Sequence, residues 1–196
     1  MAIAKMLDKD IRNAVKEKVI KQHLDDPSTL VVEELGLNYG KNRVDIAVVN
    51  GELHGYELKS DSDNLIRLPA QIVSYSAVMD KVTLVVGKKH AEEAIPMIPD
   101  WWGVKIATMG DTGKIKLNTA RRNRVNKNIE PLELIKLLWK EELIILLSTR
   151  INIDWRIKKL KRKDIYQLVI DTFTLDEIRY AVRTTMKSRS DWRCPE

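Results

Sequence analysis

The dipeptide Asn50-Gly51 constrains this chain more than any other feature of its sequence. It lies between two β-prone segments, residues 43–49 and 52–59, and Asn-Gly in that setting is the strongest short-range signal of a β-hairpin. A tight two-residue turn would pair Val49 with Glu52. A type I turn that ends with Gly51 as a left-handed bulge would shift the pairing by one residue.

The apolar pattern of the two strands favours the shifted register. That register unites on one buried face Val44, Ile46, Val48, Tyr56 and Leu58. The opposite face then carries small and charged residues, namely Asp45, Ala47, Leu53, Gly55, Glu57 and Lys59. Because side chains alternate along a strand, a slip of one residue would send Asp45 and Glu57 to opposite faces. We therefore expect a bulged hairpin on which both carboxylates and Lys59 share one face.

The remaining periodicity predicts alternating helices and strands up to about residue 120. We expect helices over residues 8–24, 68–79 and 90–98, and strands over residues 30–37, 81–86, 104–108 and 114–117, with a turn at 111–113. This order predicts an α/β fold, with a restriction-endonuclease-like mixed central sheet flanked by helices. Beyond it the pattern becomes helical, over residues 131–147, 164–170 and 175–187, which predicts a C-terminal helical extension.

Positive charge is concentrated in that helical part. Residues 1–120 hold 16 Lys and Arg against 17 Asp and Glu, whereas residues 121–196 hold 18 against 11. The densest cluster is the basic run at 156–163. We interpret residues 1–120 as one domain and 121–196 as a basic helical region that grips a polyanion, a solvated helical surface being the competing interpretation.

The composition indicates the cellular compartment in which the protein works. Cys194 is the single cysteine, so it forms no internal disulfide. No apolar run approaches the roughly 20 residues of a membrane span, and the first ten residues lack the apolar stretch of a signal peptide. We expect a cytoplasmic protein that does not enter a membrane.

The charged face of the hairpin fits one kind of chemistry. Hydrolysis of a phosphodiester uses a hard cation, and Mg²⁺ is held in proteins by one or two carboxylates together with water and phosphate oxygens. Asp45 and Glu57 on adjacent strands are expected ligands for Mg²⁺ or Mn²⁺, and Lys59 would orient the attacking water or stabilise developing negative charge. A surface ion-pair patch is the structural alternative.

These residues also resemble a known superfamily. A helix, a strand, Asp45 on a second strand and Glu57-Leu58-Lys59 on a third resemble the PD-(D/E)XK nucleases, which include restriction endonucleases, Holliday-junction resolvases and RecB-like exonucleases. The resemblance covers about residues 8–90, and the usual Pro-Asp is here Val44-Asp45. It implies that Asp45 and Glu57 bind the metal and that Lys59 is the catalytic lysine.

Two further residues follow from this resemblance. Many members add an upstream acid, for which Glu34 is our choice, with Asp10 and Glu17 as rivals on the first helix. Gln71 and Tyr75 match the Gln-x-x-x-Tyr motif of RecB-like members, which implies that Gln71 holds the geometry of the metal site or contacts DNA. Tyr75 is more simply interpreted as a core residue. Stretches at 54–61 and 99–103 also resemble a group of uncharacterised bacterial proteins.

The sequence thus predicts a metal-dependent nuclease that hydrolyses phosphodiester bonds, with DNA favoured over RNA by the resemblance alone. Two other functions stay open: a nucleic-acid-binding module that does not cut, and a protein-interaction module whose basic helices dock an acidic partner. A homodimer is compatible with any of them. The three histidines are scattered and receive no catalytic role, and Asp61 and Asp63 are expected to serve the turn after Lys59.

Overall fold

A computed structural model describes residues 5–110 and 112–189 of the chain. Its strands are β1 (Leu30–Leu37), β2 (Asn42–Asn50), β3 (Glu52–Lys59), β4 (Lys81–Gly87), β5 (Gly103–Met109) and β6 (Ile115–Arg121). The helices of the α/β part are α1 (Asp8–Lys18), α2 (Lys21–Leu24), α3 (Leu68–Val78) and α4 (Lys88–Met97). The C-terminal helices are α5 (Pro131–Ile135), α6 (Lys140–Ser148), α7 (Trp155–Lys159), α8 (Arg162–Thr172) and α9 (Leu175–Ser188).

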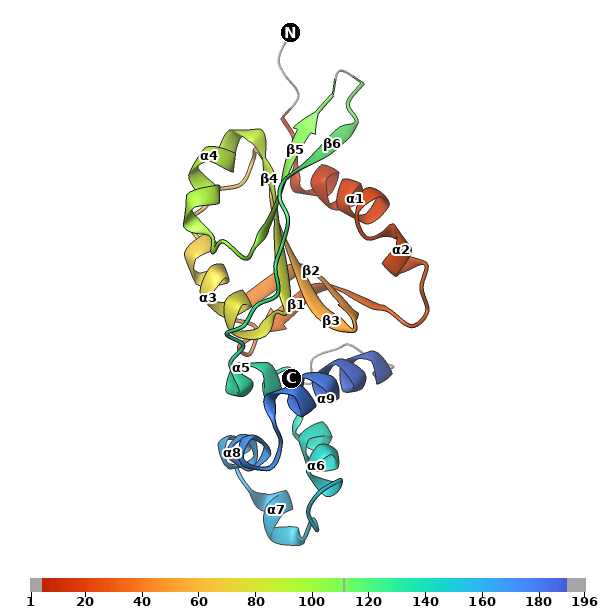
Figure 1. The fold of residues 1–196 in the computed structure, drawn as a ribbon, viewed down its shortest axis with the longest axis vertical. Coiled ribbons are helices and arrows are strands. Elements are labelled where there is room, and N and C mark those ends of the chain that lie inside the picture. The colour runs from red at the N-terminus through yellow and green to blue at the C-terminus, as the bar shows by residue number, and fades with distance from the viewer. Residues whose placement is uncertain (1–4, 111, 190–196) are drawn as a thin grey trace.

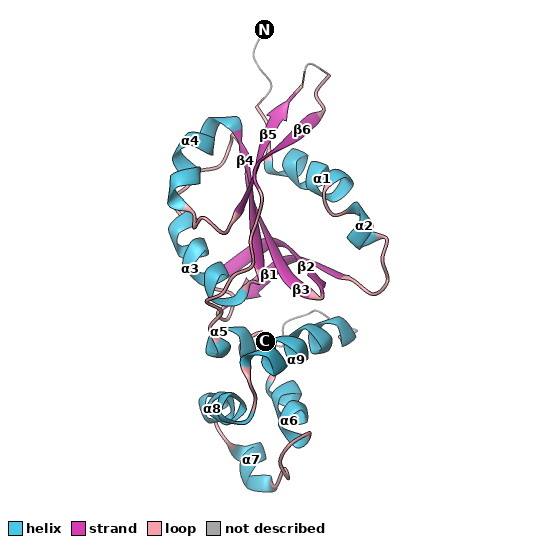
Figure 2. Ribbon diagram, viewed as in Figure 1, coloured by secondary structure: helices cyan, strands magenta, loops and turns pink. Residues whose placement is uncertain are grey.

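The six strands form one mixed sheet in the order β1-β2-β3-β4-β5-β6. β3, β4 and β5 are parallel, because α3 and α4 provide the crossovers between them, and the other neighbours are antiparallel. Figure 1 shows α3 and α4 on one face of the sheet and α1 with α2 on the other. The predicted α/β architecture is therefore confirmed, including the C-terminal helices that Figure 2 shows below the sheet.

The hairpin adopts the shifted register. Val49 pairs with Leu53 and Asn50 pairs with Glu52, and Gly51 between them has φ 67°, in the left-handed region. Glycine adopts that region without steric cost, so the turn accommodates the shift that the apolar pattern favours. The same register places Ile46 opposite Tyr56 and brings Asp45 to the level of Glu57.

One part of the face assignment was wrong. Ile46 packs with α1 as expected, but Val44 belongs to the core on the α3 side, 3.2 Å from where a Cβ on Gly55 would lie. The strands are irregular at this point, because Glu34 has φ 55° and leaves a gap in the ladder opposite Asp45. The alternation of side chains is interrupted there, and both faces of the hairpin are buried.

Several helix boundaries differ from the prediction. The helix expected over residues 8–24 breaks before Ile20, which is fully buried between α1 and α2. The helix expected over 131–147 is split, because Trp139 caps α6 through a bond from its N–H to Glu142. Helix α7 was not predicted. The expected turn at 111–113 includes Asp111, which lies outside the described residues.

The C-terminal helices share the larger hydrophobic core with the α3 face of the sheet. That core runs continuously from Leu84 and Tyr75 to Leu143 and Val182. In Figure 1, α5 and α9 lie between the sheet and the remaining C-terminal helices. Among the described residues, no helix combines the length and the apolar character that crossing a membrane requires.

A buried carboxylate strengthens this junction. Asp80 accepts a hydrogen bond of 2.6 Å from the N–H of Leu53 and forms ion pairs with Arg179 and Arg183 of α9. Its side chain is almost completely buried. Because a buried charge is tolerated only when it is paired, these contacts fix α9 against the ends of β3 and β4.

Candidate functional site

A polar cavity of about 520 Å³ opens beside the C-terminal half of β3. Its walls come from α1, the β1–β2 loop, β2, β3 and the first turn of α3. The lining residues are Asp8, Arg12, Glu34, Gly40, Lys41, Asn42, Arg43, Asp45, Glu57, Leu58, Lys59, Asp63, Arg67 and Gln71. All the residues that were predicted to be catalytic, and Glu34 with them, therefore line this cavity.

Asp45 lies at the wall of this cavity with its side chain 18% exposed. One carboxylate oxygen accepts a hydrogen bond of 2.7 Å from the N–H of Leu58, and the other lies 3.6 Å from the Arg12 guanidinium. Burial, and then the neighbouring charge of Glu57, raise the pKa of Asp45 to about 7. The charge of Glu57 is thus close enough to disfavour the ionisation of Asp45.

Glu57 and Lys59 form a buried ion pair deeper in the cavity. Lys59 Nζ donates to Glu57 Oε1 over 2.6 Å and to Gln71 Oε1 over 3.1 Å. Burial raises the pKa of Glu57, although the contact with Lys59 opposes that shift. Tyr75 is fully buried, which confirms its prediction as a core residue. Its hydroxyl also contacts Glu57.

This burial excludes the structural alternative of a surface ion-pair patch. Glu57 is completely buried and Lys59 nearly so. Removing two charges from water costs more than an exposed pair gains, and packed apolar residues would stabilise the position as well or better. A buried charged group that lines a cavity is more typical of a functional site than of a stabilising contact.

Arg12 occupies the outer part of the cavity. Its guanidinium contacts Asp8 at 3.1 Å, Glu34 at 3.2 Å and Glu33 at 3.4 Å, in addition to Asp45. The sequence interpretation missed Arg12 and Asp8, although their i, i+4 spacing on a helix was a signal that they share a face.

The three candidates for the upstream acid lie in different places. Glu34 lines the cavity, but its side chain is 49% exposed and paired with Arg12. Of its two rivals, Asp10 caps α1 by accepting from the N–H of Leu7 over 2.9 Å, and Glu17 is exposed. Neither rival lines the cavity.

The donor set suits a hard divalent cation held by few protein ligands. Within residues 5–110 and 112–189, no group of three His, Cys, Asp or Glu side chains is placed to hold a metal. Asp45 and Glu57 supply two carboxylates, which is the number that Mg²⁺ commonly takes from a protein. A cation between them would also relieve the repulsion that raises the pKa of Asp45.

Three cations surround the cavity mouth. Lys41, Arg43 and Arg67 are exposed, and none forms an ion pair with a carboxylate in the described part of the chain. The cavity mouth therefore carries exposed positive charge, whereas the carboxylates of the interior are paired with Arg12 and Lys59.

The other sequence candidates have structural roles. Asp63 accepts from the N–H and the hydroxyl of Ser60, at 2.7 and 2.6 Å, which confirms its expected turn role. His54 stacks on Tyr56 at 4.3 Å between ring centroids, and burial lowers its pKa to about 3. Trp102 is fully buried against Tyr75.

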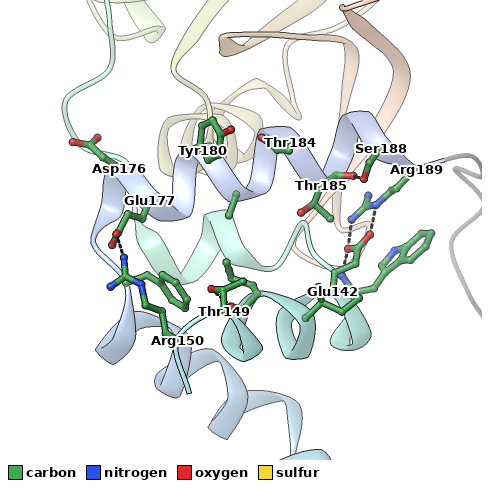
Figure 3. A pocket seen from close by; sticks show the side chains of 15 residues that line it. Glu142, Thr149, Arg150, Asp176, Glu177, Tyr180, Thr184, Thr185, Ser188 and Arg189 are labelled. Atoms are coloured by element: carbon green, nitrogen blue, oxygen red, sulfur yellow. Dashed lines mark hydrogen bonds and ion pairs between the residues drawn. The ribbon is translucent and has the colours of Figure 1, made fainter. Parts of the chain in front are cut away.

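A larger groove of about 830 Å³ lies between α6 and α9 (Figure 3), and none of the carboxylates of the polar cavity lines it. Its lining is mainly apolar, and ion pairs from Arg150 to Glu177 and from Arg189 to Glu142 cross it at either end. Tyr180 projects from the exposed side of α9. The groove lacks converging carboxylates, so it does not offer the chemistry of the polar cavity.

Comparison with known proteins places the whole chain in one family. The family profile described as Bacteriophage P4 protein cII matches residues 1–193. The chain belongs to the bacteriophage P4 protein cII family. Protein cII of Enterobacteria phage P4 is 25% identical over 182 residues, which cover 93% of this chain and 67% of that protein. A protein of unknown function from Silicibacter pomeroyi aligns at 19% identity with a TM-score of 0.42, over 76% of this chain and 94% of its own.

Because the family match spans both the sheet and the C-terminal helices, the cavity and the basic helical region belong to the same family unit. The descriptions of these relatives state no activity. The chemistry of this family member therefore has to follow from its own cavity.

Proposed function

We propose that this member of the P4 cII family is a metal-dependent nuclease that hydrolyses phosphodiester bonds. The observation that carries the proposal is the convergence of Asp45, Glu57 and Lys59 in one polar cavity. The resemblance to PD-(D/E)XK nucleases at the same three residues, and at Gln71, supports it independently of the cavity. That resemblance also favours DNA as the substrate, and the single cysteine, which forms no internal disulfide, favours a cytoplasmic setting.

Each residue has a role that follows from its contacts. Asp45 and Glu57 would hold Mg²⁺ or Mn²⁺, with Glu34 at the outer edge of the site. The bound cation would neutralise phosphate charge and lower the pKa of a water ligand. Lys59 lies 2.6 Å from Glu57 and would stabilise negative charge as it develops on the phosphate. Gln71 accepts from Lys59 and so fixes the position of its ammonium group.

The basic surfaces would bind the substrate. Lys41, Arg43 and Arg67 at the cavity mouth are placed to contact phosphates beside the scissile bond. The cationic run at 156–163 in α7 and α8 would extend the binding surface over the C-terminal helices. Contacts of this type release counterions, so the affinity should fall steeply as the salt concentration rises.

The test is a cleavage assay with single- and double-stranded DNA and RNA, in Mg²⁺, Mn²⁺ or EDTA. We expect cleavage in a divalent cation only, and a loss of at least about 100-fold with Asp45→Asn, Glu57→Gln or Lys59→Met. Asp25→Asn is the matched control, because Asp25 is exposed and remote from the cavity lining. Cleavage that survives in both Asp45→Asn and Glu57→Gln would show that the activity comes from elsewhere.

One observation favours a second candidate, a nucleic-acid-binding module that does not cut. The Arg12 guanidinium already neutralises Asp45 and Glu34, at the place where a divalent cation would contact them. On that alternative, the protein binds DNA in a salt-dependent manner, cuts nothing with either cation, and binds no better with Mn²⁺ than with EDTA. On that alternative Arg12→Gln cuts no nucleic acid either. In a nuclease, by contrast, the bound cation would displace Arg12, so Arg12→Gln should still cut.

A further inference from the structure

Two exposed aromatic rings stand on the basic side of the molecule, each flanked by two cations. The Trp155 ring is 62% exposed, with the Arg156 guanidinium 5.7 Å and Lys159 Nζ 5.0 Å from its centre. The Tyr39 ring is 61% exposed, with Lys136 Nζ and the Arg162 guanidinium both 5.9 Å from its centre. In both cases cations lie over an exposed aromatic ring, and at Tyr39 one of them, Lys136, is also paired with Glu133.

Tyr39 is held in place by an unusual backbone. Asn38, Tyr39 and Gly40 have φ angles of 47°, 58° and 79°, a region that residues other than glycine rarely adopt. Such a conformation persists where the surroundings fix it, and the Tyr39 hydroxyl lies 3.1 Å from that of Tyr166 on α8. The loop therefore presents the ring at the junction between the sheet and the helices. Lys41, two residues further along, lies at the cavity mouth.

Trp155 stands at the other end of a cationic surface. Arg156, Lys158, Lys159, Lys161, Arg162 and Lys163 are all exposed, and none has an ion-pair partner among the carboxylates that the structure describes. The nearby Asp154 instead caps α7, accepting from the N–H groups of Arg156 and Ile157. Arg162, which contacts Tyr39, follows Trp155 by seven residues, a span of at most about 25 Å. The two rings thus border the same stretch of exposed cations, and Lys41, which follows Tyr39 by two residues, lines the cavity.

We propose that Trp155 and Tyr39 are stacking platforms for unpaired bases, and that this surface binds a single strand of nucleic acid. Aromatic faces stack on any base, and cations beside them bind the phosphates of the same strand. A duplex keeps its base faces stacked inside, so it would engage only the cations. The inference rests on the proposed function for the claim that the bound strand leads to the cavity as substrate.

The experiment measures the binding of a fluorescently labelled single strand and of the matching duplex by anisotropy. EDTA is present throughout and the protein carries Asp45→Asn, so that no cleavage interferes. We expect tighter binding of the single strand than of the duplex. Trp155→Ala and Tyr39→Ala should each weaken single-strand binding by about 5- to 150-fold, because stacking on one base raises the affinity by about that factor. Duplex binding should change little.

Tyr180→Ala is the matched control, since Tyr180 is 68% exposed but lies on α9 beside the apolar groove. It should bind as the parent does. Trp155→Phe keeps a ring at the same place and should retain most of the affinity, which separates stacking from a folding defect. Circular dichroism and thermal melts check that each variant folds.

Three results would overturn the inference: unchanged single-strand binding in both alanine variants, an equal loss for single strand and duplex, or a similar loss with Tyr180→Ala. A failure of the proposed function is a different result. In that case the unmodified protein cuts nothing with Mg²⁺ or Mn²⁺, while the single-strand preference and its dependence on Trp155 and Tyr39 remain. The platforms then belong to a binding module.

Discussion

Replacing Asp45 with Asn should stabilise the fold at neutral and alkaline pH. The pKa of Asp45 is raised from 3.8 to about 7 by burial and by the charge of Glu57. Below about pH 4 its carboxyl is protonated in both the folded and the unfolded chain, so it does not change the free energy of unfolding. Between pH 4 and 7 the unfolded chain releases the proton that the folded chain keeps, so the free energy of unfolding falls as the pH rises.

The size of the effect follows from the shift. About three pKa units at 1.36 kcal/mol each give a cost of about 4 kcal/mol, which is fully present above about pH 7. The asparagine amide carries no charge, and its oxygen still accepts the hydrogen bond from the N–H of Leu58. The variant should therefore match the natural protein near pH 4 and exceed it by up to about 4 kcal/mol near pH 8.

Urea unfolding followed by tryptophan fluorescence at these two pH values measures the difference, in EDTA so that no cation binds. Asp25→Asn is the control, because the Asp25 side chain is 65% exposed and carries no comparable burial cost. A variant at Asp45 that is no more stable than the natural protein near pH 8, or a difference that is the same at both pH values, would refute the argument from burial.

Three further predictions follow from the same contacts. Lys59→Met should lower the free energy of unfolding by about 3–5 kcal/mol in urea titrations, because it leaves Glu57 charged and unpaired, and adding Glu57→Gln should restore most of the loss. Calorimetry should find Mn²⁺ binding that tightens as the pH rises toward and through about 7, as Asp45 loses its proton, and equal affinity at pH 5 and 8 would contradict this. Gly87→Ala should lower the melting temperature by no more than about 4 °C, because its Cβ would meet the movable end of the Asp61 side chain, and a loss well beyond that would show that Asp61 cannot move aside.

Much of the sheet could be predicted from local pattern. Strands β1 and β3 have the expected bounds, and the Gly51 bulge followed from requiring the apolar side chains of the hairpin to share a face. The same alternation rule failed at Val44. The failure has a physical source, because the left-handed residue Glu34 interrupts the β1–β2 ladder opposite Asp45, and nothing in a strand-like Glu-Glu pair signals a positive φ.

The site itself was predictable in its centre and not at its edges. Glu57, Lys59 and Gln71 lie close in sequence, so strand and helix spacing fixed their relation. Arg12 reaches Asp45 across 33 residues, and a contact of that range depends on how α1 packs on the sheet. For the same reason the position of Tyr39 against α8 followed from no local pattern.

A crystal soaked in Mn²⁺ and measured for anomalous scattering tests the central claim most directly. We predict one ion per chain within about 2.0–2.3 Å of carboxylate oxygens of both Asp45 and Glu57, with Arg12 moved away from Asp45. Under the same conditions, a cavity that takes up no ion, with Arg12 still paired to Asp45, would contradict the account.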